Sequence, residues 1–172
     1  MTAKVFIQNL SVSIISLVIF LALGEIATRI IAGSPLITQP DPVLFWKYKP
    51  NQTGHQKLYS PLSRVDKNGF RYSGKDYEPG RPSIYIGGDS YAWGEGVSDA
   101  ETFPAQLQSL LEAHNLKYNM LNGGVPGYGI EQIINRMQAE CKIYKPKYAV
   151  FAWVESDMDR LRDISPLKKK YF

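Results

Sequence analysis

The chain has 172 residues, with 44% hydrophobic and 21% charged residues and a formal net charge of +4. This composition is ordinary for a globular protein, and the length suits one domain with an appendage. The single cysteine, Cys141, excludes an internal disulfide. Basic residues gather at Lys168–Lys170, and no basic stripe with interleaved aromatic residues occurs elsewhere, which argues against nucleic-acid binding.

Residues 1–32 are expected to form a membrane anchor. Residues 5–24 are long enough to cross a bilayer core, which needs about 20 helical residues, and the stretch Ile14–Leu23 carries no charge. Lys4 and the terminal amine precede this stretch. The positive-inside rule therefore predicts a single-pass topology with the N-terminus in the cytoplasm and the rest of the chain outside it, in a periplasmic or extracellular space.

Two alternatives to an uncleaved anchor stay open. Ala22-Leu23-Gly24 could supply the small residues before a signal-peptide cleavage site. The segment could also be a buried helix of a soluble protein, although its uncharged apolar stretch at the extreme N-terminus favours the membrane. Near its far end, Glu25 and Arg29 lie four residues apart and are predicted to pair on one helix face.

Residues 33–80 are expected to form a connecting segment. They are rich in proline and glycine, so long regular elements are not predicted there. Phe45, Trp46 and Tyr48 make the segment too aromatic for a free linker, and we expect it to pack over the edge of the following domain. Phe70–Tyr72 is predicted as a short edge strand.

Residues 81–172 alternate between strand and helix patterns, which is typical of a parallel sheet with covering helices. The expected elements are a buried strand at Ser83–Ile86 followed by a glycine break, a helix at Glu101–His114, a strand at Lys117–Leu121, a glycine loop at Asn122–Gly129, a helix at Ile130–Ile143 and a buried strand at Lys147–Val154. Right-handed crossovers place the loops after the strands on one edge of the sheet. We therefore expect Ser90, the 122–129 loop and the loop after Val154 to converge.

Apolar residues at helical spacing predict the inward faces of the two helices. These residues are Phe103, Leu107, Leu110 and Leu111 in the first helix and Ile130, Ile133, Ile134 and Met137 in the second.

Ser90 is the predicted nucleophile at this edge. Cleavage of an ester by a serine also requires donors for the oxyanion and an oriented base. The backbone N–H of Gly127 can donate to an oxyanion, and Ser156 lies on the same edge. The base is missing from the pattern, because His55 lies in the proline-rich stretch and His114 ends a helix that leads away. Both histidines are interpreted as surface or partly buried residues.

Three motifs carry a resemblance to a known family. These are Gly88-Asp89-Ser90 with Gly94-Glu95-Gly96-Val97, the loop Asn122-Gly123-Gly124-Val125-Pro126-Gly127-Tyr128-Gly129, and Tyr144-Lys145-Pro146 before a hydrophobic strand. In this order and spacing they resemble the first three sequence blocks of SGNH/GDSL hydrolases. Asn68-Gly69-Phe70-Arg71 resembles the turn ahead of the first block in membrane-anchored members.

The resemblance implies an α/β fold, a flavodoxin-like three-layer α/β/α arrangement around a parallel sheet. It implies Ser90 as the nucleophile, with its own N–H, the N–H of Gly127 and a side chain of the third block as the oxyanion hole. Ser156 occupies that third-block position. The resemblance implies no metal and no organic cofactor.

Two departures from the family pattern bear on activity. The third block of the family has Asn followed by Asp, whereas this sequence has Ser156-Asp157, so a hydroxyl replaces an amide donor. The family's Asp-x-x-His block, which supplies the base, has no counterpart up to Phe172. Residues 81–172 are therefore expected to be a partial hydrolase domain, either part of a longer protein or a domain without a triad.

The same residues permit other interpretations. Ser90 could be a turn or helix-cap serine. The 122–129 loop could cradle a phosphate, although it lacks the lysine of a P-loop. The acidic residues Glu155, Asp157, Asp159 and Asp163 alternate with Arg160 and Arg162, which indicates a solvated helix face rather than a cation site. Cys141 is interpreted as a packed thiol.

These patterns predict a serine ester hydrolase or acyl transferase attached to a membrane through its N-terminal helix. Its expected substrates are ester-bearing small molecules, acylated envelope glycans or lipids, and no nucleic acid is expected as a partner. The alternative is a truncated or inactive family member that serves as a membrane-anchored binding or assembly protein.

Overall fold

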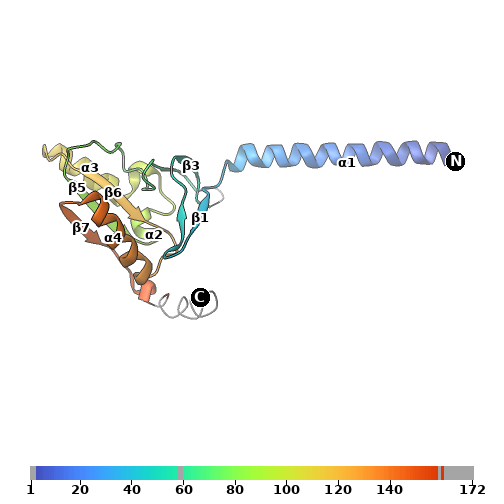
Figure 1. Cartoon of the computed structure of the whole chain (residues 1–172). Helices are drawn as coiled ribbons and strands as arrows, with labels where there is room; N and C mark the ends of the chain where they lie inside the picture. The colour runs from blue at the N-terminus through green and yellow to red at the C-terminus, as the bar shows by residue number, and fades with distance from the viewer. Residues whose placement is uncertain (1–2, 58–59, 159, 161–172) are drawn as a thin grey trace. The chain divides into compact units, whose positions relative to one another are not determined.

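The computed structural model describes residues 3–57, 60–158 and 160 (Figure 1). The chain divides into two compact units, Met1–Ser34 and Pro35–Phe172. The first unit contains one long helix, and the second contains the strands and the shorter helices.

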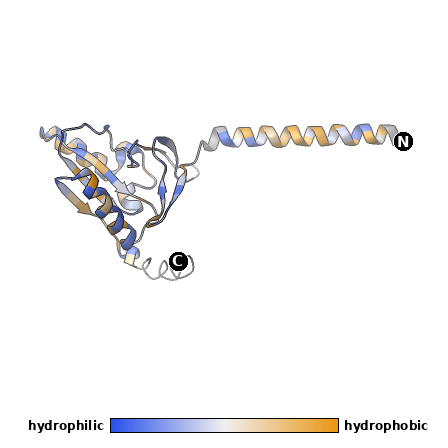
Figure 2. Ribbon diagram, viewed as in Figure 1, coloured by the Kyte–Doolittle hydropathy of each residue, from blue (hydrophilic) through white to orange (hydrophobic). Residues whose placement is uncertain are grey.

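Helix α1 spans Ala3–Ala32. Its stretch Ile7–Arg29 contains an 18-residue window with a mean hydropathy of 2.3 and is long and apolar enough to cross a membrane or to act as a signal sequence. Hydrophobic residues recur along the length of the helix (Figure 2). The predicted pair near its end is confirmed, since Arg29 Nε lies 2.8 Å from Glu25 Oε1.

The connecting segment forms two short antiparallel strand pairs. Strands β1 (Thr38–Asp41) and β2 (Phe45–Tyr48) form one pair, and β3 (Gln52–His55) and β4 (Leu62–Val65) form the other. The expectation that this segment packs onto the following residues is confirmed. Tyr48 and Val65 are buried in a cluster that includes Trp93 and Tyr128.

The centre of the second unit is a parallel three-stranded sheet with the strand order β6-β5-β7. The elements are β5 (Ser83–Gly88), α2 (Ser90–Trp93), a 3-10 turn (Asp99–Glu101), α3 (Phe103–Ala113), β6 (Asn119–Gly124), α4 (Ile130–Tyr144) and β7 (Tyr148–Phe151). The first strand in sequence lies in the middle of the sheet, as in flavodoxin-like folds. Every residue of β5 is buried.

The two faces of the sheet are covered by different helices. Ile84 and Ile86 of β5 face a cluster that includes Ala92 of α2 and Leu107 of α3. Tyr85 points to the other face, in a cluster with α4 residues. This alternation follows from the two-residue period of a strand. The predicted α/β/α arrangement around a parallel sheet is confirmed (Figure 1).

The predicted glycine break after Ile86 and the predicted start of the glycine loop at Asn122 are wrong, because these glycines belong to the strands. β5 includes Gly87, and β6 includes Gly123. A Cβ on Gly87 would lie 2.4 Å from Met137 Cγ, and a Cβ on Gly123 would lie 2.3 Å from Tyr85 Oη. These positions need glycine because a helix and a neighbouring ring approach the backbone closely, not because the chain turns there.

Part of the predicted burial is wrong. Phe103 and Leu110 of α3 are 44% and 61% exposed, while Ala105 and Gln108 are buried. Strand β7 is confirmed as a strand, but all four of its residues are exposed in the described part of the chain. The face of α3 is set by how the helix lies on the sheet, and β7 is an edge strand with a neighbour on one side only.

Candidate active site

The loop after β5 places Ser90 at the start of α2. Asp89 caps this helix, because its Oδ1 accepts a hydrogen bond of 2.9 Å from the N–H of Tyr91. Asp89 is buried and Ser90 is half-buried. The Ser90 hydroxyl lies 3.3 Å from Asp89 Oδ2. Asp89, not Ser90, is therefore the helix cap, and the cap interpretation does not account for the serine.

The loop after β6 is a tight turn against the end of β5. The N–H of Val125 donates to the Gly88 carbonyl at 3.0 Å, and the N–H of Tyr128 donates to the Val125 carbonyl at 3.2 Å. Pro126 and Gly127, with a φ of +85° at Gly127, fit a type II turn. The Gly127 residue is exposed, and its N–H has no acceptor among the described residues.

The loop after β7 is held by a buried carboxylate. The N–H of Ala152 donates to the Gly87 carbonyl at 2.9 Å, which brings this loop against β5. Asp157 Oδ2 accepts from the N–H of Val154 at 3.0 Å, and the N–H of Asp157 donates to the Val154 carbonyl at 2.9 Å. Ser156 lies in the helical turn that follows and is exposed. Its hydroxyl makes no hydrogen bond within the described part of the chain.

Arg160 joins the three loops. Its Nη1 lies 2.9 Å from the Tyr128 carbonyl, 2.8 Å from Asp157 Oδ1 and 3.6 Å from Asp89 Oδ2. These three partners come from the loops after β6, β7 and β5. The predicted convergence of the loops is confirmed.

The prediction of a solvated face for the acidic stretch is confirmed for Glu155, which is exposed, and wrong for Asp157. Asp157 is buried, and Arg160 contacts buried groups. The spacing of three residues between them was the available sequence signal for this pair. Asp159, Arg162 and Asp163 lie outside the described residues.

The buried carboxylates set the electrostatics of the edge. Burial raises the pKa of Asp157, and the nearby charge of Asp89 raises it further. The N–H of Val154 and the Arg160 guanidinium oppose this rise. One guanidinium thus faces two buried carboxyl groups next to Ser90, and it offsets part of the cost of burying them.

Two glycines allow the loops to come this close. A Cβ on Gly124 would lie 2.3 Å from the backbone N of Trp93, and a Cβ on Gly88 would lie 2.6 Å from the Ala152 carbonyl oxygen. In both cases the neighbouring atom belongs to the backbone, so there is no room for any side chain at Gly124 or Gly88.

A cavity of about 500 Å³ lies beside Ser90. Its lining residues are Ser90, Tyr91, Gly94, Glu95, Val97, Glu101, Thr102 and Phe103. Gly127 and Ser156 are not among them. The structure thus brings the loops of the three predicted site residues together, but no described contact joins Ser90 to Gly127 or to Ser156.

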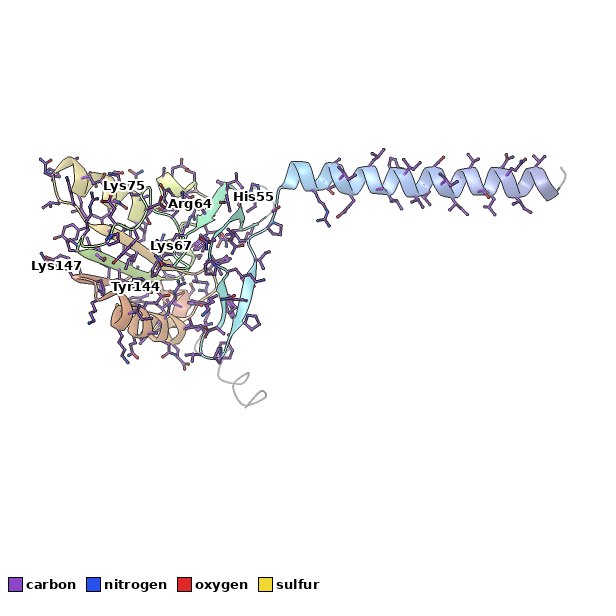
Figure 3. The ribbon with its side chains drawn as sticks, turned by 45° about the horizontal axis from the view of Figure 1, so that its top comes forward. His55, Arg64, Lys67, Lys75, Tyr144 and Lys147 are labelled. Carbon is purple, nitrogen blue, oxygen red and sulfur yellow. The ribbon has the colours of Figure 1, made fainter. Side chains whose placement is uncertain are left out.

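A larger cavity, of about 530 Å³, lies elsewhere and lacks this chemistry. It is lined by residues of the segments 51–53, 64–67 and 76–77, including Arg64 and Lys67, and by no serine, cysteine or histidine (Figure 3). We therefore place the candidate site at the smaller cavity, next to Ser90.

Neither histidine reaches Ser90. His55 lies on β3, where its Nδ1 contacts the Ser60 carbonyl (Figure 3). His114 follows the last residue of α3 and caps that helix. Neither lines the cavity. No group of three acidic, histidine or cysteine side chains that could hold a metal occurs in the described ranges.

Sequence reasoning missed a second arginine of this region. Arg71 is buried, and its guanidinium bonds to the segment that follows α2. The sequence predicted Arg71 in an edge strand, Phe70–Tyr72, and the structure shows isolated bridges at Arg71 instead. That prediction carries no signal of the guanidinium contacts, since their partners lie more than 20 residues away. Cys141 packs against the cluster on the α4 face, as expected.

No protein-family model and no curated protein matches the chain. The chain is similar to the solved structures of AlinE4, an SGNH-hydrolase family esterase, and of a mutant of that esterase. Each match has 26% sequence identity and a TM-score of 0.42, and covers 54% of this chain and 49% of the other. The chain spans about half the length of these structures.

Proposed function

We propose that this chain carries the nucleophile and oxyanion side of a serine ester hydrolase or acyl transferase of the SGNH/GDSL type. The observation that carries the proposal is the contact of Arg160 with all three loops that the motifs predict to form the site. It supports a single site at the carboxyl edge of the sheet, where ligands of open α/β sheets bind.

In the proposed reaction, the Ser90 oxygen attacks the carbonyl carbon of an ester, and the alcohol leaves. Ser90 is the first residue of α2, so its own N–H has no acceptor within the helix and can donate to the oxyanion. The N–H of Gly127, which has no acceptor among the described residues, is the second proposed donor. The Ser156 hydroxyl is the third.

The proton of Ser90 requires a base, and neither His55 nor His114 is near it. The proposal therefore includes a base from outside the described residues. The distance of both histidines from Ser90 favours a second function. In it, the chain is a membrane-anchored binding or assembly protein, and the cavity beside Ser90 holds an ester without cleaving it.

The proposed substrates are acylated envelope glycans, lipids or small esters. The proposed topology, with the N-terminus cytoplasmic and the second unit outside the cytoplasm, rests on the apolar stretch of α1 and on Lys4, which precedes that stretch in the first turn of the helix. Protease treatment of cells that carry a C-terminal tag, with the cytoplasmic membrane intact and any outer membrane made permeable, tests this topology. A tag that resists protease until the cytoplasmic membrane is lysed would contradict it.

Hydrolysis of an aryl acetate by the full chain tests the chemistry. We expect Ser90→Ala to lower kcat by about a thousandfold or more, because it removes the nucleophile. Ser109→Ala is the matched control, since Ser109 is an exposed serine whose hydroxyl bonds within α3. Equal rates for Ser90→Ala and the unchanged chain would refute the Ser90 mechanism. Ester binding without turnover in the unchanged chain would favour the second function.

A further inference from the structure

Arg71 has a buried guanidinium, and its backbone is hydrogen-bonded to β6. Its side chain is 0% exposed. Its N–H donates to the Asn122 carbonyl on β6 at 3.1 Å, and it forms isolated bridges with Val65 and Asn122. A charged side chain in such a place requires partners for its donors, because an unpaired buried charge is strongly destabilising.

All partners of the Arg71 guanidinium lie in one segment, residues 93–99. Nη1 donates to the Trp93 carbonyl at 2.8 Å and also to the Gly94 carbonyl. Nη2 donates to the Val97 carbonyl at 2.7 Å, and Nε donates to Asp99 Oδ1 at 3.0 Å. Three of these acceptors are backbone carbonyls at the last residue of α2 and in the stretch that follows it, where carbonyls have no acceptor role within a helix. The planar fork of an arginine can reach several such acceptors at once.

The same segment forms one wall of the cavity beside Ser90. Gly94, Glu95 and Val97 line the cavity, whereas Arg71 does not. Arg71 therefore lies behind the wall. Lys57 holds the wall at a further point, through an ion pair with Glu95. The connecting segment thus supplies the side chains that order this part of the cavity.

We propose that Arg71 is a positioning residue that fixes the 94–97 wall and thereby sets the size of the acyl group that the cavity accepts. The proposal rests on the proposed function for its substrate. Without the guanidinium, three carbonyls lose their donors, and the wall between Gly94 and Val97 is free to move. A cavity with a mobile wall discriminates less between short and long acyl groups, because discrimination depends on fixed contacts.

Amide hydrogen exchange of the full chain tests the ordering of the wall. We expect Arg71→Lys to raise exchange in a peptide spanning residues 90–101 by at least about tenfold, since several charge-assisted hydrogen bonds are lost. Asp99→Asn removes one charged partner of Arg71 and should raise exchange in this peptide by a smaller factor. Exchange in β5 should stay unchanged in both variants.

Arg136→Lys is the matched control. Arg136 is also a buried arginine, but it bonds to Glu140 and to the Gly69 carbonyl, and none of its partners lies in residues 93–99. It should lower thermal stability without raising exchange in the wall. Unchanged exchange of the wall in Arg71→Lys, or an equal rise in Arg136→Lys, would overturn the proposal.

Acyl-chain selectivity supplies the second readout. The ratio of kcat/KM for p-nitrophenyl acetate to that for p-nitrophenyl octanoate should change by at least about fivefold in Arg71→Lys, mainly through KM. It should not change in Arg136→Lys. The same ratio in Arg71→Lys and the unchanged chain would overturn the selectivity role. Hydrolysis that persists in Ser90→Ala would instead overturn the proposed function, and the exchange experiment would still decide the ordering role.

Discussion

The middle of the sheet and its carboxyl edge are held together by different forces. β5 is buried on both faces by apolar side chains from three helices. The hydrophobic effect that stabilises this packing is non-directional, so it does not depend on any single pair of residues. At the carboxyl edge, the loops are joined by single charged groups, Arg160 to the buried carboxyls and Arg71 to the cavity wall. Changes in the middle should therefore affect folding, whereas changes at the edge should affect the site.

The largest stability effect is expected where the two regions meet, at Gly124. In Gly124→Ala the new Cβ would lie 2.3 Å from the backbone N of Trp93. Because backbone cannot move aside as a flexible side chain can, we expect a loss of about 3 kcal/mol in the free energy of unfolding. Chemical denaturation monitored by circular dichroism measures it.

Gly96→Ala provides the comparison for that loss. Unlike Gly124, Gly96 has a positive φ, of +85°, and a Cβ there would meet open space. Gly96→Ala should lower the free energy of unfolding only through backbone strain, by about 1 kcal/mol. Equal losses at Gly96 and Gly124 would contradict the close approach of α2 to β6.

Arg160→Met separates the edge from the middle. It removes the contacts to Asp89, Tyr128 and Asp157 while keeping an apolar stem of similar length. We expect ester hydrolysis to fall by about a hundredfold, since small misplacements of catalytic groups have effects of that size. The melting temperature should fall as well, because Asp89 and Asp157 lose the positive charge that offsets their burial. Arg64→Met, which removes an exposed pair with Asp76, is the control and should leave hydrolysis unchanged. A large fall in melting temperature with normal hydrolysis would place Arg160 in the folding core instead.

The smallest effect is a pH dependence of stability at the edge. The pKa of Asp157 in the folded chain is raised above its ordinary value of 3.8, mainly by burial. The folded chain therefore binds this proton more tightly than the unfolded chain, and the free energy of unfolding falls as the pH rises through the window above 3.8. Relative to Asp157→Asn, the unchanged chain should gain stability as the pH is lowered from 7 toward 4. Parallel stability curves for the two proteins would contradict a raised pKa.

The sequence could predict the edge but not what holds it together. The motifs around Ser90 and Gly127 and the alternation of strands and helices predicted the converging loops, because these signals depend on neighbours along the chain. The apolar spacing in α3 predicted burial for Phe103 and Leu110, and both are exposed. A helical period marks residues that share a face, but it does not say which way the helix turns on the sheet.

By itself, the sequence determined the order of β5, α3, β6, α4 and β7, the apolar N-terminal helix and the position of Ser90 after a buried strand. Only the tertiary structure decided that Asp157 is buried, that Arg160 joins three loops and that Arg71 orders the wall of the cavity. Backbone period, turn chemistry and glycine placement act over a few residues and can be read along the chain. The partners of a buried charge are chosen by which loops meet in space, and for Arg71 and Asp99 that meeting spans 28 residues.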